Sequence, residues 1–137
     1  MNSEISNLVN FLFEWRVLKY VPRAGLNFLK GPIKENLAEH TLYTVIIAWI
    51  LTKLEKADES KTIKMALIHD LAEVRGGDRE LMNKIYGGPI KEIKIIKEIS
   101  KGHNLKNFQM EKLIRELFQG KTKEAKIVED ADMLSEM

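Results

Sequence analysis

The residues from Glu35 to Ala57 constrain the fold most, because they contain a long helical pattern that is apolar on most sides. The middle of this stretch reads YTVIIAWILTKL, and no proline or glycine interrupts it. A helix that is hydrophobic all round has to be covered by other parts of the protein. We therefore expect a central helix over these residues, with the remaining segments packed around it.

The other segments also follow helical periodicity, and none shows the sustained alternation of a half-buried strand. Breaks rich in glycine and proline, such as VPRAGLNFLKGP, separate them. Short helices with short breaks predict an all-α fold, a compact helical bundle forming a single domain over residues 1–137. The further helices expected are Ser3 to about Leu18 with Ser3 as N-cap, a helix capped by Asp58 or Ser60 and running to about Val74, Asp78 to Ile85, Pro89 to about Ser100, Leu105 to Phe118, and a last helix capped by Thr122.

Composition excludes several function classes. The chain has 22 Lys and Arg against 20 Asp and Glu, so its charge gives no reason to expect a nucleic acid polymer or a membrane as partner. It has no cysteine, which excludes disulfides, thiol catalysis and cysteine-based zinc sites. The N-terminus lacks the basic region of a signal peptide, and the apolar run from Val45 to Leu51 is too short to span a bilayer. We expect a soluble, cytoplasmic protein.

The stretch MALIHDLAEVRGGD places several ionisable groups at the end of an apolar helical run. If the helix continues, Glu73 lies about 40° and Asp70 about 100° around it from His69, so all three share one sector. That sector continues the apolar face of Ala66 and Leu67, so the polar groups should point inward or into a cleft. Burying them without partners costs several kcal/mol each, roughly, and a divalent metal accepts imidazole and carboxylate together.

Two more inward-facing residues offer the same chemistry. His40 begins a face of the long helix that continues through Thr44, and Asp132 lies beside the apolar side of the last helix. With His69 and Asp70 they supply two imidazoles and two carboxylates, a set that suits Mn, Co, Fe, Zn or Mg. An inward histidine is also often a hydrogen-bonded core residue, so spacing alone leaves both interpretations open. His103 stands at a helix break among polar neighbours, and we interpret it as a surface residue.

Taken together, these residues resemble the signature of the HD-domain superfamily of metal-dependent phosphohydrolases, which is a His, a His-Asp pair and a distant Asp. More narrowly, the chain is similar to the small 5′-deoxynucleotidase group. Four blocks in family order carry this likeness: LKYVPRAG (18–25), ENLAEH (35–40), ALIHDLAEVRGGD (66–78) and EAKIVEDADMLSEM (124–137).

The resemblance implies a role for each matching position. It implies a divalent metal ion held by His40, His69, Asp70 and Asp132, and catalysis by Glu73, which would handle the attacking water, together with Asp70. It implies substrate binding by Arg23, through the phosphate, and by Asp78, through the sugar. Asp78 is also a natural N-cap for a helix after the two glycines.

The function implied is removal of the 5′-phosphate from nucleoside monophosphates, with a nucleotide as small-molecule substrate and a homodimer as the assembly. Members of the group often carry a tryptophan just after the phosphate-binding arginine, and this chain has Leu26 where it is expected, which leaves the sugar preference open. Two alternatives remain: an HD-domain hydrolase of another small phosphoester or nucleotide, and a domain that senses a nucleotide without hydrolysing it.

Overall fold

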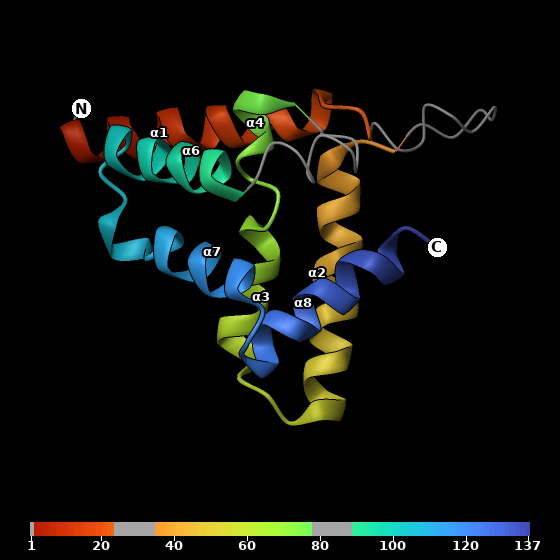
Figure 1. Ribbon diagram of the computed structural model, residues 1–137. Coiled ribbons are helices and arrows are strands. Elements are labelled where there is room, and N and C mark those ends of the chain that lie inside the picture. Colours follow the sequence, from red (N-terminus) through yellow and green to blue (C-terminus); the bar gives the residue numbers. More distant parts are fainter. Residues whose placement is uncertain (1, 24–34, 78–88) are drawn as a thin grey trace.

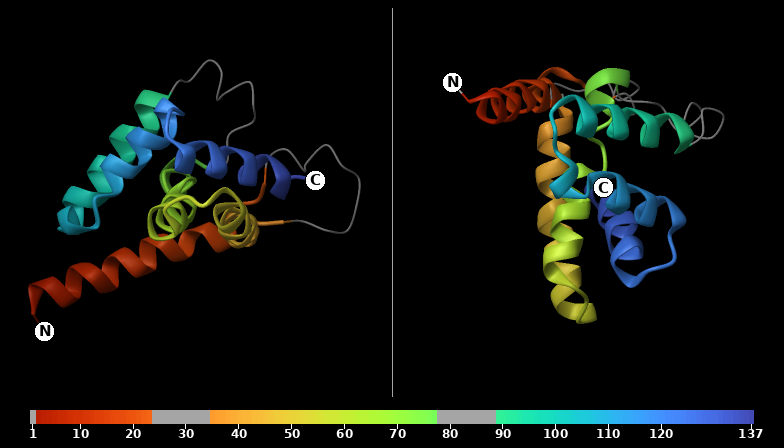
Figure 2. Two further views of the ribbon diagram at one scale, coloured as in Figure 1. Left: turned by 90° about the horizontal axis from the view of Figure 1, so that it is seen from below. Right: turned by 90° about the vertical axis from the view of Figure 1, so that its left-hand side faces the viewer.

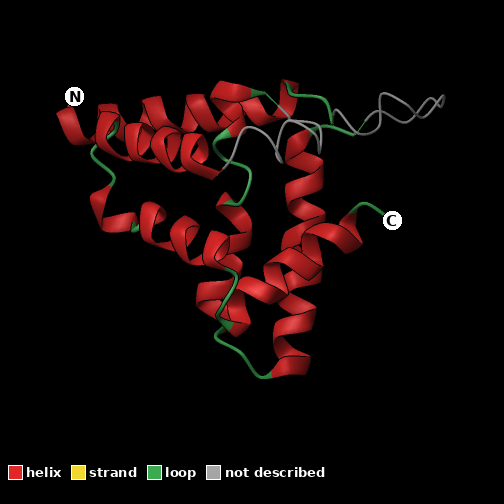
Figure 3. Cartoon of the chain, in the orientation of Figure 1, coloured by secondary structure: helices red, strands yellow, loops and turns green. Residues whose placement is uncertain are grey.

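The structure is a computed structural model that describes residues 2–23, 35–77 and 89–137, and every structural statement below concerns these residues. They contain helices and no strand, which confirms the all-α expectation (Figure 3). The helix expected from Asp78 to Ile85 lies outside the described residues. The elements in chain order are α1 (Ser3–Trp15), η1 (Arg16–Tyr20), α2 (Leu37–Glu55), α3 (Glu59–Ile68), α4 (Glu73–Gly76), α6 (Pro89–Gly102), η3 (Lys106–Phe108), α7 (Met110–Gln119) and α8 (Lys123–Ser135).

The helices pack around one buried apolar cluster. α2 packs mainly against α8 and α3, while α7 contacts α3, α6 and α8 (Figures 1 and 2). Fully buried side chains come from several helices, including Met65 of α3, Ile99 of α6, Ile114 of α7 and Ala131 of α8. This packing sets the end of α3 and the second half of α8 against the first turns of α2.

Side-chain caps fix the starts of α1, α2, α3 and α8. Asn36 and Glu39 form a capping box at α2, and the Asp58 and Thr122 side chains accept from backbone N–H groups at the starts of α3 and α8. The Asp58 and Thr122 caps are therefore confirmed. The prediction of Ser3 as a cap is wrong, since Asn2 caps α1 by accepting from the N–H of Glu4.

Within the part of the chain that the structure describes, one face of α2 packs against other helices and the opposite face is exposed, which corrects the expectation of a central helix. Its outward face exposes six large apolar side chains: Leu42, Tyr43, Ile46, Trp49, Ile50 and Leu54. By length and composition α2 is able to cross a membrane, with a mean hydropathy of 1.2, although a third of that window is buried inside the fold. The core helix of a globular domain passes the same test of length and composition, so this property alone does not assign α2 to a membrane.

One expected helix is divided in two. The stretch from Leu105 to Phe118 contains the short η3 and then α7, which begins only at Met110. Between them Gln109 has a φ of 54°, a left-handed conformation that no continuous α-helix contains.

Candidate metal centre

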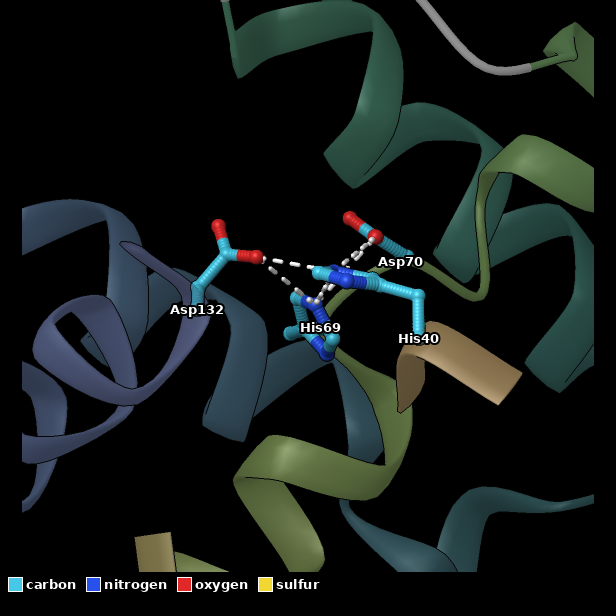
Figure 4. A group of neighbouring side chains, drawn as sticks. All are labelled: His40, His69, Asp70 and Asp132. Carbon is cyan, nitrogen blue, oxygen red and sulfur yellow. Dashed lines mark hydrogen bonds and ion pairs between the residues drawn. The ribbon is translucent and has the colours of Figure 1, made fainter. Parts of the chain in front are cut away.

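Three helices bring four of the predicted residues together. His40 lies in the first turns of α2, His69 and Asp70 follow the last residue of α3, and Asp132 lies on α8. One ligand atom from each side chain can be chosen so that all four lie within 4.8 Å of one another. Figure 4 shows both carboxylates and both imidazoles turned toward a common centre.

The backbone reaches this arrangement differently from the expectation. α3 ends at Ile68, so His69, Asp70 and Glu73 do not share one continuous helix, and the predicted angles between them do not apply. The Nδ1 atom of His69 bonds to the carbonyl of Ala66 at 2.7 Å. Tight i to i+3 bonds then follow, from the N–H of Leu71 to Ile68 and from the N–H of Glu73 to Asp70. The His69 imidazole thus bonds to the carbonyl of Ala66, to which the backbone N–H of Asp70 would bond if α3 continued.

The two imidazoles face each other through their Nε2 atoms, which are 3.3 Å apart. The Nε2 of His40 lies 2.8 Å from Asp132 Oδ1 and 3.4 Å from Asp70 Oδ2. The Nε2 of His69 lies 3.5 Å and 3.2 Å from the same two oxygens. His40 is completely buried and His69 and Asp70 nearly so, while the Asp132 side chain is one third exposed. The centre therefore has one side that solvent reaches.

The electrostatics of the centre favour positive charge. Burial lowers the pKa of both histidines, but the Asp132 and Asp70 carboxylates outweigh it, so the pKa of His40 is raised and that of His69 is raised well above its usual value. Burial raises the pKa of Asp132, yet hydrogen bonds to His40 and His69 bring it far below its usual range. The two carboxylates thus stabilise protons on the two facing imidazoles. A bound cation would supply the positive charge that these protons now supply.

The donor set fits a divalent metal ion. The carbonyl of Ala66 accepts from His69 Nδ1, so Nε2 is the nitrogen that can give its lone pair to a cation in the centre. Imidazole nitrogens and carboxylate oxygens together suit first-row divalent ions and Mg rather than a thiolate-selecting metal. A divalent metal ion is accordingly the cofactor that these residues accommodate, and its identity is open among Mn, Co, Fe, Zn and Mg.

Arg23 lies at the edge of this centre. The strand-like bridge between Pro22 and Asn36 holds it there, with the N–H of Arg23 bonded to the carbonyl of Glu35 at 3.1 Å. Its Nη1 lies 3.7 Å from Asp70 Oδ2, and the side chain is buried. Its Nη2 donates to Glu136 Oε1 at 2.5 Å. A guanidinium thus touches the same carboxylate that both imidazoles touch.

The remaining predicted residues are placed as follows. Glu73 is the first residue of α4, three residues after Asp70, and is 4% exposed. Asp78 and Leu26 lie outside the described residues, so their roles stay predictions.

Sequence reasoning missed other residues near the centre. Ser135 and Glu136 follow Asp132 by three and four positions, and this spacing places side chains on one side of a helix. The spacing in the sequence could therefore have indicated that both residues lie near Asp132. The interpretation of His103 as a surface residue is wrong. Its Nε2 is 2.6 Å from Glu14 Oε2, and its ring lies beside Phe11.

A model of the HD domain family matches residues 16–137. Among curated proteins, the chain is 33% identical over 72 residues to the 5′-deoxynucleotidase HDDC2 of Bos taurus and 32% identical over 72 residues to that of Xenopus laevis. Each match covers 53% of this chain and 35% of the relative, so the chain matches about a third of the length of these relatives.

Solved structures share the fold over nearly the whole chain. A conserved hypothetical protein from Pyrococcus furiosus has a TM-score of 0.79 and 27% identity, covering 93% of this chain and 76% of that one. A protein from Pyrococcus horikoshii has the same TM-score, identity and coverage of this chain, with 73% of its own length covered. A predicted metal-dependent phosphohydrolase from Magnetospirillum magnetotacticum, at 23% identity and TM-score 0.79, covers 97% of this chain and 70% of that one, and supports the fold alone.

Proposed function

The chain belongs to the HD domain family, and on that premise we propose that it is a metal-dependent phosphohydrolase that removes the 5′-phosphate from nucleoside monophosphates, deoxynucleotides foremost. The observation that carries the proposal is the buried group of two imidazoles and two carboxylates with an arginine at its edge. The substrate class comes from the curated relatives, which are named 5′-deoxynucleotidases.

In this proposal His40, His69, Asp70 and Asp132 hold the metal ion. When bound, a divalent cation supplies Lewis-acid activation of a water molecule and neutralises phosphate charge. Asp70 has a further part, because its Oδ2 lies near both imidazoles and near the Arg23 guanidinium. It fixes the position of the phosphate-binding group relative to the metal ligands.

Arg23 binds the substrate phosphate. A guanidinium offers two parallel N–H donors that match phosphate oxygens, and its charge does not titrate in the physiological range. The buried position of Arg23 beside Asp70 restricts the directions from which a phosphate can reach it. The proposed contact of Asp78 with the sugar rests on the family resemblance.

Glu73 accepts the proton of the attacking water. The water oxygen attacks phosphorus, the bond from phosphorus to the 5′ oxygen breaks, and the proton passes by way of Glu73 to the leaving oxygen. A carboxylate can serve this purpose when it lies within hydrogen-bond reach of the water. The burial of Glu73 and its position three residues after a proposed ligand support this role.

The test is phosphate release from 5′-monophosphates, 3′-monophosphates and triphosphates of deoxy- and ribonucleosides, with Mn, Co, Mg or Zn added in turn. We expect metal-dependent release from 5′-monophosphates that falls by about 10²- to 10⁴-fold in Glu73→Gln, the usual contribution of a general base. Glu111→Gln, which changes a carboxylate on α7, is the matched control and should keep full activity.

Other outcomes decide between the alternatives. If phosphate is released only from triphosphates or other phosphoesters, the proposed substrate class is wrong, while the proposed metal-dependent hydrolysis still holds. Metal binding and nucleotide binding without any release would overturn the hydrolase proposal in favour of a sensing domain.

A further inference from the structure

The hydroxyl of Ser135 connects three parts of the metal centre. Its Oγ lies 3.0 Å from Nδ1 of His40, 2.7 Å from the carbonyl of Asp132 and 3.2 Å from Oγ1 of Thr44. His40 and Thr44 lie one turn apart on α2, and Asp132 and Ser135 lie one turn apart on α8. The serine therefore joins the two helices at the point where each contributes a residue to the centre.

The Ser135 hydroxyl donates its single hydrogen to the backbone carbonyl of Asp132. In a continuing α-helix the N–H of Glu136 would donate to the carbonyl of Asp132, but here it donates to Met133. The Ser135 hydroxyl supplies the donor that this carbonyl lacks at the helix end, over the shortest of its three distances. With its hydrogen committed there, the serine oxygen faces His40 as an acceptor.

An acceptor at this position fixes the protonation pattern of His40. Nδ1 of His40 therefore keeps its hydrogen, and Nε2 faces Asp70, Asp132 and His69. Nε2 carries a hydrogen in the metal-free protein and offers its lone pair once a cation takes the place of that hydrogen. The same pattern holds in His69, where the acceptor is the backbone carbonyl of Ala66. One histidine is thus oriented by the main chain and the other by a side chain that a substitution can remove.

We propose that Ser135 is a positioning residue of the metal centre, which holds the His40 ring with its Nε2 lone pair toward the cation. This inference rests on the proposed metal site and concerns cation binding, so it is separable from the question of the substrate. Partners on the outer nitrogen of a metal-binding histidine orient the ring and raise its affinity for the ion.

The first measurement is the affinity of the metal-free protein for Mn²⁺ or Co²⁺ by calorimetry. We expect Ser135→Ala to bind about 10- to 100-fold more weakly than wild type, the usual cost of losing such a partner. Ser135→Thr keeps the hydroxyl and should restore most of the affinity. Ser60→Ala, on the exposed start of α3, is the matched control and should bind as wild type does.

The second measurement separates positioning from general stability. In ¹H–¹⁵N spectra of the metal-free protein, the Nδ1–H of His40 should be observable and slow to exchange with solvent in wild type and in Ser135→Thr, and should exchange faster in Ser135→Ala. Thermal unfolding of each variant checks that the fold is intact. A purely structural role would lower the melting temperature and leave this exchange unchanged.

Each result has one interpretation. Wild-type affinity in Ser135→Ala, or an unchanged exchange of the His40 Nδ1–H in it, overturns the positioning role even if the protein releases phosphate. Weaker binding with Thr rescue supports that role even if no nucleotide is hydrolysed. A wild-type protein that binds no divalent ion overturns both proposals.

Discussion

Among the residues that the structure describes, Glu35, Asp70 and Glu136 lie near the Arg23 guanidinium, and Glu136 is the most exposed of the three. Its guanidinium lies 3.9 Å from Glu35, 3.7 Å from Asp70 and 2.5 Å from Glu136. The Glu136 side chain is 57% exposed, whereas those of Glu35 and Asp70 are 20% and 8% exposed. A phosphate that binds Arg23 must take over the N–H groups that Glu136 now uses, so the two anions compete.

Glu136→Gln should therefore strengthen substrate binding. An exposed ion pair contributes about 0.2–1 kcal/mol, so we expect the KM for a nucleoside monophosphate to fall by roughly 1.5- to 5-fold with little change in kcat. The pair is also screened by salt, so the difference should shrink at high ionic strength. Steady-state kinetics at low and high salt measure both effects. Glu129→Gln, which changes an exposed carboxylate on α8, is the control, and an unchanged or higher KM in Glu136→Gln would contradict the competition.

At the scale of elements, local signals predicted the helices and tertiary contacts decided where some of them end. Asp58 and Thr122 are strong caps with short-range partners, so the starts of α3 and α8 could be derived from sequence. The end of α3 could not, because it depends on the His69 ring reaching the carbonyl of Ala66. Periodicity assumes an unbroken helix, yet it still identified His69, Asp70 and Glu73 as inward-facing, since all three are buried.

The short helix α4, which begins with Glu73, is tied to α1 and α6 by two carboxylates that flank Arg75. Glu14 of α1 accepts from Nε of Arg75 at 2.5 Å and from its Nη2 at 3.2 Å, and it lies 2.6 Å from Nε2 of His103. Glu98 of α6 lies 3.7 Å from the other side of the Arg75 guanidinium. A helix of four residues has little stability of its own, so these contacts hold α4 in place.

Glu14 should make the stability of the protein depend on pH. The hydrogen bond to Arg75 lowers the pKa of Glu14 against the opposing effect of burial, with help from His103. A carboxyl whose folded pKa lies below its unfolded value stabilises the fold above the unfolded pKa, here 4.5, and loses that contribution as the pH falls through the folded pKa. We expect Glu14→Gln to lower the free energy of unfolding by about 1–2 kcal/mol at neutral pH and by less as the pH falls below 4.5.

Urea unfolding of both proteins at several pH values measures this difference. Glu4→Gln changes an exposed carboxylate on the same helix and should show no such dependence. A destabilisation of Glu14→Gln that stays constant down to pH 3 would show that the carboxylate charge is not what holds α4.

At the scale of the whole molecule, the polar centre and the apolar surface lie on opposite sides of α2. His40 and Thr44 face α8, while the six exposed apolar residues of the outward face point away from it. Leu12 of α1 and Leu42 of α2 line a groove of about 420 Å³ between the two helices, which extends this surface onto α1. A large side chain covers on the order of 200 Å², so these seven half-exposed side chains leave roughly 700 Å², close to the area of about 800 Å² that one partner contributes to a standard interface.

We expect a second copy of this chain to cover that surface, because an apolar face on one copy can match the same face of another across a two-fold axis. Light scattering after size exclusion should then give twice the chain mass of 15.8 kDa. Ile46→Lys and Ile50→Lys place a charge within the face and should give monomers with the metal centre intact, whereas Phe108→Lys, an exposed apolar residue on η3, should stay dimeric. A wild-type monomer would contradict the homodimer, and its binding to lipid vesicles would assign the same surface to a membrane instead.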